Sequence, residues 1–480
     1  MRLVRRIPRA AWICGLIACL NAVCWSLVTP AFQVTDEPAH FAYVKQLAET
    51  GRLPSSSSQE TAAEEGAVLR ALHQGAVRLR PQNQTIATQA EQEALERELA
   101  ATPHETGSPE AGVAASQPPL YYALEAIPYT LASSGTVLDR LQLMRLMSAL
   151  FAGLTAIFAF LFTRETLPGE PWAWTVGGLS VALAPLLGFM SGAVNPDSLL
   201  FAVSAATFYC LARAFRRGLD TGGAVAIGVV TAIGLVTKLN FVGLVPGILL
   251  GLIILSIRAR RASGSSAWRP LALALALGFS PVVVYAVINA LSGDALLGQV
   301  SWRASSIQSV PAEINYIWQL YLPRLPGTVN DFPGLFTTRQ FWFDGYVGLY
   351  GWLDTTFPSW VYSIALIPTA AIALLCGRAL VGARAALRSR AAELAVYATA
   401  AVGVMALVGA ASYTVFPEVD AEYAQARYLL PMLALFAAAL ALAARGAGRR
   451  WGPTVGTLIV VLFLAHDIVS QMLVAARFYG

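Results

Sequence analysis

The chain has 480 residues, of which 56% are apolar and only 13% are charged. This composition excludes an ordinary soluble protein and is typical of one that crosses a membrane many times. The formal net charge of +5 gives no reason to infer a nucleic-acid partner, because the basic residues lie in short clusters between apolar stretches, where anionic lipid headgroups are their natural partners.

Apolar stretches long enough to cross a hydrocarbon core, which takes about 20 helical residues, recur along the chain. Their helical patterning predicts an all-α polytopic membrane protein. We expect about eleven transmembrane helices, near residues 9–29, 141–163, 172–190, 197–214, 222–238, 240–257, 269–291, 358–377, 392–413, 427–444 and 453–473. The first is long and lacks a clear cleavage pattern, so we interpret it as a retained anchor rather than a signal peptide.

These spans divide the chain into five parts. We expect an N-terminal anchor (1–30), a first outer loop with juxtamembrane helices (31–140), spans two to seven (141–291), an aromatic-rich second outer loop (292–357) and four final spans (358–480). The middle of the first loop, about 55–110, is rich in Ser, Glu, Gln and Ala. Part of it can be helical, and its role is left open.

The motif Asp-Glu-Pro-Ala-His at residues 36–40 follows the first span directly. Charges at such depth are costly and are usually retained for ion pairing, substrate binding or proton transfer. A plainer alternative is that carboxylates in a first helical turn favour the helix dipole. We interpret Asp36 and Glu37 as candidate catalytic residues, and His40 and Lys45 as candidate substrate ligands.

The segment 118–131 is apolar enough to resemble a further span, but it is short and carries Glu125 and Pro128. If it does not cross, the later arginine clusters all fall on the side of the N-terminal arginines, which the positive-inside rule makes the cytoplasm. We therefore expect the N-terminus inside a bacterial cytoplasmic membrane, with residues 36–40 facing outside.

Other polar residues are expected at the same outer level. Arginine suits a phosphate because its guanidinium presents paired donors, whereas an aspartate in a turn can be only a helix cap and a lysine at a span end can simply reach for the headgroups. The remaining candidate substrate ligands are Tyr121, Arg145, Asp197, Lys238, Trp352, Asp354, Arg427 and Tyr428.

Six short motifs, in order, resemble a known family. They are Thr35-Asp36-Glu37-Pro38-Ala39-His40-Phe41, Gln117-Pro118-Pro119-Leu120-Tyr121-Tyr122, Arg145-Leu146-Met147-Ser148-Ala149-Leu150, Asn195-Pro196-Asp197, Gly351-Trp352-Leu353-Asp354 and Arg427-Tyr428-Leu429-Leu430-Pro431. Together they resemble a bacterial multi-pass membrane family of unassigned function. That family is similar to the GT-C glycosyltransferases, which include protein O-mannosyltransferases and the aminoarabinose transferase of lipid A.

The resemblance implies a GT-C-like fold, with Asp36 as the catalytic base, Asp197 at the active site and segment 118–131 as a helix that does not cross. The insertion at about 55–110 departs from the family pattern and leaves acceptor recognition open. A divalent cation between Asp36 and Asp197 stays an alternative, although no motif demands one.

Location narrows the donor, because nucleotide sugars are absent outside the cytoplasmic membrane and the chain has no phosphate-binding Gly-rich loop. We expect an inverting transfer from a polyprenyl-phosphate sugar to a glycan, lipid or protein acceptor. Two alternatives remain open: a polysaccharide polymerase or ligase, and a lipid-linked glycan transporter, which should show internal repeats and broken paired helices.

Overall fold

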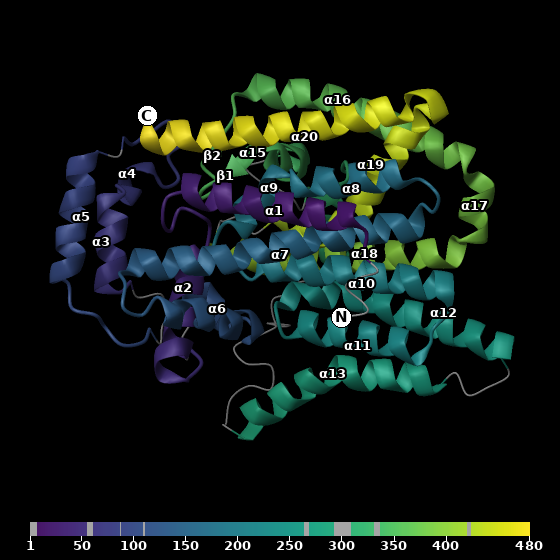
Figure 1. Ribbon diagram of the computed structural model, residues 1–480, viewed down its shortest axis with the longest axis horizontal. Helices are drawn as coiled ribbons and strands as arrows, with labels where there is room; N and C mark the ends of the chain where they lie inside the picture. Colours follow the sequence, from purple (N-terminus) through teal and green to yellow (C-terminus); the bar gives the residue numbers. More distant parts are fainter. Residues whose placement is uncertain are drawn as a thin grey trace.

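The computed structural model describes residues 7–54, 61–86, 88–108, 111–263, 268–291, 309–330, 337–419 and 424–480. Within these ranges the secondary-structure elements are helices apart from one short hairpin, and loops and turns connect them (Figure 1). Parts of both outer loops predicted from the sequence, namely 55–60, 109–110, 292–308 and 331–336, lie outside the described residues.

The expected all-α membrane protein is confirmed. In the described part of the chain, nine helical segments are long and apolar enough to cross a membrane. They are α1 (Arg9–Val28), α7 (Val137–Thr166), α10 (Asp197–Arg217), η3 with α12 (Leu239–Leu244 and Val245–Ser263), α13 (Trp268–Leu291), α16 (Ser359–Gly382), α18 (Ala391–Val419), η6 with α19 (Ala426–Met432 and Leu433–Gly446) and α20 (Gly448–Tyr479).

Eleven spans were expected, but the described chain has nine such segments, or ten if a bent pair is counted as one span. Two of the expected spans therefore take another form. The first is a pair, α8 (Pro171–Ala182) and α9 (Pro185–Ser191), bent by 52° at the break between them. Pro185 begins the second half, and a proline there cannot continue the hydrogen-bond ladder of the first. The second is α11 (Thr221–Leu235), a shorter apolar helix of 15 residues.

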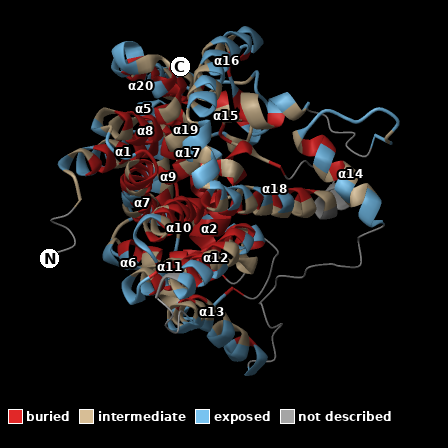
Figure 2. Ribbon diagram, turned by 90° about the vertical axis from the view of Figure 1, so that its right-hand side faces the viewer, coloured by how far each residue is buried: buried red, intermediate tan, exposed pale blue. Residues whose placement is uncertain are grey.

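The centre of the bundle is formed by α1, α7 and α10, which pack along much of their lengths. The backbones of α1 and α7 approach closely at Gly15 and Gly153, where a Cβ added to Gly153 would lie 2.9 Å from the carbonyl oxygen of Gly15. Such contacts between small residues are the usual way for membrane helices to pack. Figure 2 shows the buried residues gathered on α7 and α10, whereas α13 and α16 are largely exposed, as expected of helices that face lipid.

The ends of α10 and α12 lie at one end of the bundle, at the right in Figure 1, where α17 (Arg384–Ser389) joins α16 to α18, and the arginines of residues 1–6 lie outside the described chain. Glu165, near the end of α7, accepts a hydrogen bond from Arg217 at the end of α10 (2.9 Å). The carbonyl oxygen of Thr166 accepts one from Arg390, which precedes α18 (2.6 Å). The helices therefore present their basic ends on one side, in line with the charge distribution expected from the sequence.

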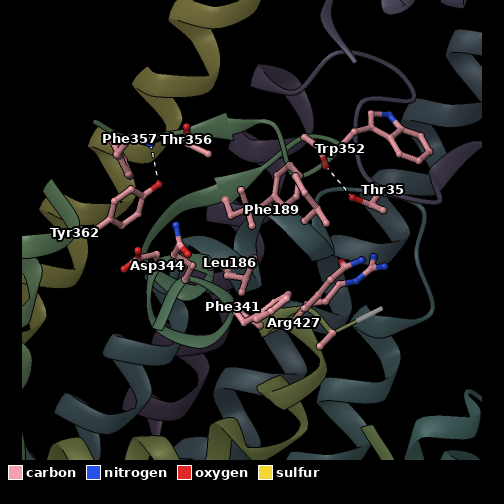
Figure 3. Close-up of a pocket in the computed structure, with 18 of the residues that line it drawn as sticks. Thr35, Leu186, Phe189, Phe341, Asp344, Trp352, Thr356, Phe357, Tyr362 and Arg427 are labelled. Atoms are coloured by element: carbon pink, nitrogen blue, oxygen red, sulfur yellow. Dashed lines mark hydrogen bonds between the residues drawn. The ribbon is translucent and has the colours of Figure 1, made fainter. Parts of the chain in front are cut away.

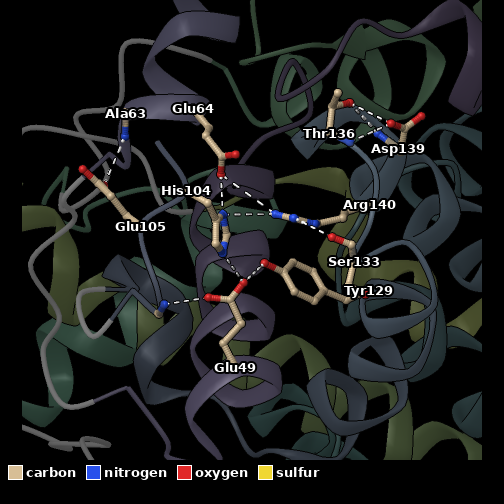
Figure 4. Close-up of polar contacts among 11 residues, drawn as sticks. Glu49, Ala63, Glu64, His104, Glu105, Tyr129, Ser133, Thr136, Asp139 and Arg140 are labelled. Atoms are coloured by element: carbon tan, nitrogen blue, oxygen red, sulfur yellow. Dashed lines mark hydrogen bonds and ion pairs between the residues drawn. The ribbon is translucent and has the colours of Figure 1, made fainter. Parts of the chain in front are cut away.

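The opposite end carries the first outer loop, built from α2 (Glu37–Thr50), α3 (Ala63–Ala71), α4 (Gln74–Val77), α5 (Gln89–Ala101), η2 (Gly112–Ser116) and α6 (Leu120–Leu131). Helix α6 has 12 residues, too few to cross a bilayer, and packs against α2 and α7. The Glu-rich insertion is attached through His104, whose ring nitrogens contact Glu49 of α2 (2.9 Å) and Glu64 of α3 (3.0 Å) (Figure 4).

The second outer loop includes α14 (Val310–Tyr321), a π-helical turn η5 (Gln340–Asp344), α15 (Gly345–Gly348) and the strands β1 (Leu349–Tyr350) and β2 (Thr355–Thr356). The strands are antiparallel, with Leu349 opposite Thr356 and Tyr350 opposite Thr355. The connecting turn holds Gly351 at a φ of 64°. A Cβ at Gly351 would lie 2.6 Å from Asp354 Oδ1, so this turn requires glycine.

Candidate active site

Two ion pairs lie together at the end of the bundle that carries the outer loops. Arg427 Nη2 donates to Asp36 Oδ2 at 2.6 Å, and Lys238 Nζ donates to Asp197 Oδ1 at 2.7 Å. Arg427 Nε also lies 3.9 Å from Asp197 Oδ2, which joins the two pairs into one cluster. Four charged residues predicted separately from the sequence are thus neighbours in the fold. We call them the four-charge cluster.

Asp36 is held in place by an uncommon backbone conformation. It immediately precedes α2 with a φ of 68°, in the left-handed region, where aspartate is one of the few non-glycine residues found regularly. Its side chain makes no capping hydrogen bond to α2 and is paired with Arg427 instead. The neighbouring Thr35 Oγ1 donates to the carbonyl oxygen of Gly351 at 2.8 Å, which ties this segment to the β1–β2 turn.

Asp197 is placed by the turn between α9 and α10. Asn195 Oδ1 accepts a hydrogen bond from the Asp197 backbone N–H at 3.0 Å, and α10 begins at Asp197. A carboxylate in the first turn is favoured by the helix dipole. The carboxylate nevertheless bonds Lys238 rather than the α10 backbone, so helix capping does not account for its position.

The cluster keeps its acidic group ionised. Burial alone would raise the pKa of Asp36, but the charges of Arg427 and Lys238 outweigh it, so this pKa lies below its ordinary value. For Lys238, burial lowers the pKa more than the partner Asp197 raises it. The Asp36 side chain retains 26% of its surface exposed, against 4% for Arg427, so Asp36 is the accessible member of that pair.

His40 lies beside the cluster as a neutral group. Burial, followed by the charge of Lys238, lowers its pKa to about 3. Its Nδ1 lies 3.0 Å from the hydroxyl of Tyr122. Tyr121 was expected as a ligand from the sequence and Tyr122 was not, because consecutive residues of a helix point about 100° apart and spacing alone does not tell which one faces α2.

Two nitrogens of the Arg427 guanidinium are left without a hydrogen bond in the described chain. Its Nε and Nη1 are buried and form no hydrogen bond with any residue that the structure describes, and the same holds for Asp197 Oδ2. Buried polar groups are normally satisfied, so such exceptions call for an explanation. Nη2 is 3.4 Å from the Tyr428 hydroxyl, and the Tyr428 ring lies under both cations, 5.2 Å from Arg427 Cζ and 5.9 Å from Lys238 Nζ.

A cavity of about 620 Å³ opens beside the cluster. Figure 3 shows Arg427, Thr35 and Trp352 at one end of it and Asp344 and Tyr362 at the other. The wall between them is mainly apolar and is formed by α9, η5 and the hairpin. Its apolar lining includes Leu186, Phe189, Met190, Phe341, Leu349, Leu353 and Phe357. This volume and lining are typical of a site for a small amphipathic ligand.

Glu37 and Arg145 are not among the residues that line this cavity, and they bond each other. Arg145 Nε and Nη2 donate to the two carboxylate oxygens of Glu37 at 2.8 and 2.6 Å. Arg145 also donates to the carbonyl oxygens of Ser26, Thr29 and Pro30. These five hydrogen bonds equal the donor capacity of a guanidinium. This geometry favours a structural role for both residues, and the catalytic role of Glu37 and the substrate-binding role of Arg145 expected from the sequence stay predictions.

Trp352 and Asp354 hold the insertion over the cavity. Asp354 Oδ2 accepts a hydrogen bond from the Leu79 backbone N–H at 2.8 Å and pairs with Arg477 of α20 at 3.5 Å. The Arg78 guanidinium stacks on Trp352, 3.7 Å from the ring centroid. Leu79 lines the cavity. Its backbone φ of 59° lies in the left-handed region. Trp352 therefore lies at the candidate site, whereas Asp354 acts on it through Leu79.

Lys45 and Tyr121 lie apart from the four-charge cluster in their contacts. Burial raises the pKa of Glu65 in α3 to about 8, and the nearby charge of Lys45 opposes that shift. The Tyr121 hydroxyl is 2.7 Å from Ser148 Oγ, which donates to Glu125 at 2.8 Å. Neither residue is joined to the four-charge cluster by a hydrogen bond or ion pair among the contacts of the described chain.

A model of the predicted membrane protein family DUF2142 matches residues 19–436 of the chain. The chain belongs to this family. The predicted resemblance to a multi-pass membrane family of unassigned function is thereby confirmed. No curated protein matches the chain by sequence.

Among solved structures, the apo form of an oligosaccharyltransferase from Archaeoglobus fulgidus is similar to this member of DUF2142, with a TM-score of 0.43 and 12% sequence identity. The superposition covers 98% of this chain and 56% of the archaeal chain. The chain therefore spans little more than half the length of that protein.

The carboxylates of this DUF2142 member fit a divalent cation poorly. Asp36 already pairs with Arg427 and Asp197 with Lys238, so an ion between the two carboxylates would lie against two buried positive charges. Within the described ranges, no group of three His, Cys, Asp or Glu side chains is arranged to hold a metal ion. No step of the function proposed below is therefore assigned to a metal.

Proposed function

We propose that the chain is an inverting membrane glycosyltransferase of the GT-C type, which transfers a sugar from a polyprenyl phosphate to a hydroxyl group of a cell-envelope acceptor. The observation that carries this proposal is Arg427, a buried guanidinium that pairs with the accessible Asp36 and has two nitrogens without hydrogen-bond partners in the described chain. The pair combines a candidate base with an anion-binding group, and Arg427 lines the cavity described above.

In the proposed step, Asp36 takes the proton of the acceptor hydroxyl while the acceptor oxygen attacks the anomeric carbon. The bond from that carbon to the phosphate oxygen breaks, and the polyprenyl phosphate leaves with the electron pair. A positioned base of this kind contributes about 10²- to 10⁴-fold to a rate. Because one displacement replaces the leaving group from the opposite face, the configuration at the anomeric carbon inverts.

Arg427 Nε and Nη1 are the donors proposed to receive the leaving phosphate. A buried guanidinium is well suited to this role, since it presents several donors in a fixed plane and stays charged. Preorganised donors aimed at developing negative charge are often the largest contribution to catalysis. Lys238 adds positive charge, and Asp197 holds it in place by the 2.7 Å hydrogen bond.

The proposed site faces outward. Asp197 begins α10 and Arg217 ends it, and 21 helical residues extend about 30 Å. The four-charge cluster therefore lies a membrane thickness away from the basic end of the bundle. With that basic end in the cytoplasm, the cluster lies at the outer surface, where a lipid-linked donor is the available form of activated sugar.

The direct test is incubation of the purified full-length chain with a panel of polyprenyl-phosphate monosaccharides and hydroxyl acceptors. We expect at least one donor to yield polyprenyl phosphate and a product of inverted anomeric configuration, measured by mass spectrometry and NMR. The polymerase, ligase and transporter alternatives predict no release from any monophosphate-linked sugar, and that outcome would contradict the proposal.

Arg427→Lys should move the acidic limb of the pH–rate profile to higher pH. In the native protein Arg427 keeps the pKa of Asp36 below its ordinary value, so the base stays ionised as the pH falls. A lysine lacks the planar fork, so Asp36 is less stabilised as an anion and is protonated at higher pH. The measurement is kcat and KM for the donor against pH. If the acidic limb of the profile does not move and the variant is only less stable, Arg427 has a structural role and no effect on the base.

A further inference from the structure

A second cavity lies far from the candidate active site, between the end of α12 and the start of α13. Its volume is about 460 Å³. It is lined by Ile253, Ser256, Ile257, Arg260, Arg261, Trp268 and Leu271. The five residues from α12 recur at intervals of three and four, so they form one continuous face of that helix.

This face changes character along the helix axis. Ile253 and Ile257 line its membrane-interior part, and Arg260 and Arg261 follow, with Arg260 about 10 Å beyond Ile253 at a rise of ~1.5 Å per residue. Trp268, at the start of α13, is 58% exposed at the same level as the arginines. Tryptophan and arginine at the end of an apolar groove are characteristic of a lipid headgroup region.

The cavity also contains a buried polar group without a partner. Ser256 is 4% exposed, and its hydroxyl oxygen has no hydrogen-bond partner among the described residues. It lies on the cavity wall between the apolar and the basic parts. A hydroxyl in this position can donate to an ester or phosphate oxygen of a ligand, which would satisfy it.

The cavity belongs to the basic end of the bundle. Arg258, on another face of α12, lies over the ring of Phe215 at 5.2 Å, next to the arginines that end α10. Helix α13 packs mainly on α11 and touches α12 less, so a groove stays open between α12 and α13. In the orientation proposed above, this groove faces the cytoplasmic leaflet, which carries anionic lipid.

We propose that this cavity binds one anionic phospholipid. Its phosphate would lie at Arg260 and Arg261, and the parts of its acyl chains nearest the headgroup would lie along Ile253, Ile257 and Leu271. The charge of the two arginines selects an anionic headgroup, and the apolar walls select a lipid over a soluble phosphate. The site is about a membrane thickness from the four-charge cluster, so it is independent of the proposed transfer reaction.

The experiment measures thermal unfolding of the purified full-length chain in a nonionic detergent, titrated with dioleoyl phosphatidylglycerol. We expect the unfolding temperature to rise with the logarithm of the lipid concentration, as for any ligand of the folded state. Dioleoyl phosphatidylcholine should give no comparable rise, and glycerol phosphate should give none. An equal rise with phosphatidylcholine, or a full rise with glycerol phosphate, would overturn the proposal.

Variants locate the effect. Arg260→Gln with Arg261→Gln should remove most of the phosphatidylglycerol shift, whereas Arg449→Gln with Arg450→Gln should retain it. The control pair is also two arginines beside a tryptophan, Trp451, but does not line the cavity. Ile257→Trp provides a second test without a charge change, because it fills the cavity from a residue that is 45% exposed. Retention of the full shift in the glutamine pair and in Ile257→Trp would contradict the assignment.

Discussion

Asp36→Asn is expected to lower the rate of sugar transfer by about 10²- to 10⁴-fold, the usual contribution of a positioned general base. Asparagine has nearly the same shape as aspartate and can still accept a hydrogen bond from Arg427, but it does not take a proton from the acceptor. The measurement is single-turnover release of polyprenyl phosphate. Donor affinity should change little, because Nε and Nη1 of Arg427, the proposed phosphate donors, are not bonded to Asp36.

Asp344→Asn is the matched control for this variant. Asp344 lines the cavity that Arg427 also lines, carries the same charge as Asp36 and pairs with Arg339 at 3.1 Å, but it forms no ion pair with Arg427 within the described chain. We expect it to keep activity within a few-fold of the native protein. Full activity of Asp36→Asn, with unfolding temperature unchanged in both variants, would remove Asp36 from the mechanism and with it the proposed chemistry.

Most of the membrane-spanning helices could be predicted from the sequence because a span depends on one-dimensional quantities, whereas the side of the membrane that each end faces stays a prediction. The length of an apolar run decides whether it can cross, and the arginine clusters decide the side. Segment 118–131 shows the value of the second rule, since its apolar content alone suggests a span and α6 has only 12 residues. Length alone predicted one span at 172–190. The structure has a bent pair of helices there, because the helix breaks before Pro185.

The depth of the charged residues could be predicted, but not their partners. Asp36, Asp197, Lys238 and Arg427 were expected at one membrane level, and the structure joins them. Arg145 was expected there too, yet it bonds Glu37 and three backbone carbonyls. Which side of a helix meets which neighbour depends on packing between segments over a hundred residues apart, and a single sequence does not encode that directly.

The docking of the insertion illustrates the same limit. The sequence composition indicates that part of the insertion is helical. It does not indicate that Arg477, in the last helix, binds the insertion. Arg477 donates to the carbonyl oxygens of Val77, Arg80 and Pro81 and pairs with Asp354. An arginine near the end of a final span looks like a headgroup anchor in the sequence. Its actual partners are backbone groups of a loop almost 400 residues away, and no side-chain pattern marks them.

Glu37→Gln should destabilise the fold by about 3–5 kcal/mol, the usual cost of removing one partner of a buried ion pair. Glu37 is fully buried and Arg145 is 3% exposed, so the remaining guanidinium charge would have no carboxylate and little water. Glu37 also accepts backbone N–H groups of Phe32 and Val194. Loss of the carboxylate therefore loosens the segment that positions Asp36. Thermal unfolding in detergent measures the effect.

Glu165→Gln is the control at the other end of the bundle. Its partners Arg216 and Arg217 are 46% and 52% exposed, so they can turn to solvent, and we expect a cost of about 1 kcal/mol or less, as for exposed pairs. A large loss of stability specific to Glu37→Gln supports the structural role. If instead Glu37→Gln unfolds like Glu165→Gln but transfers no sugar, Glu37 takes part in the chemistry, and its bond to Arg145 would have to open when substrate binds.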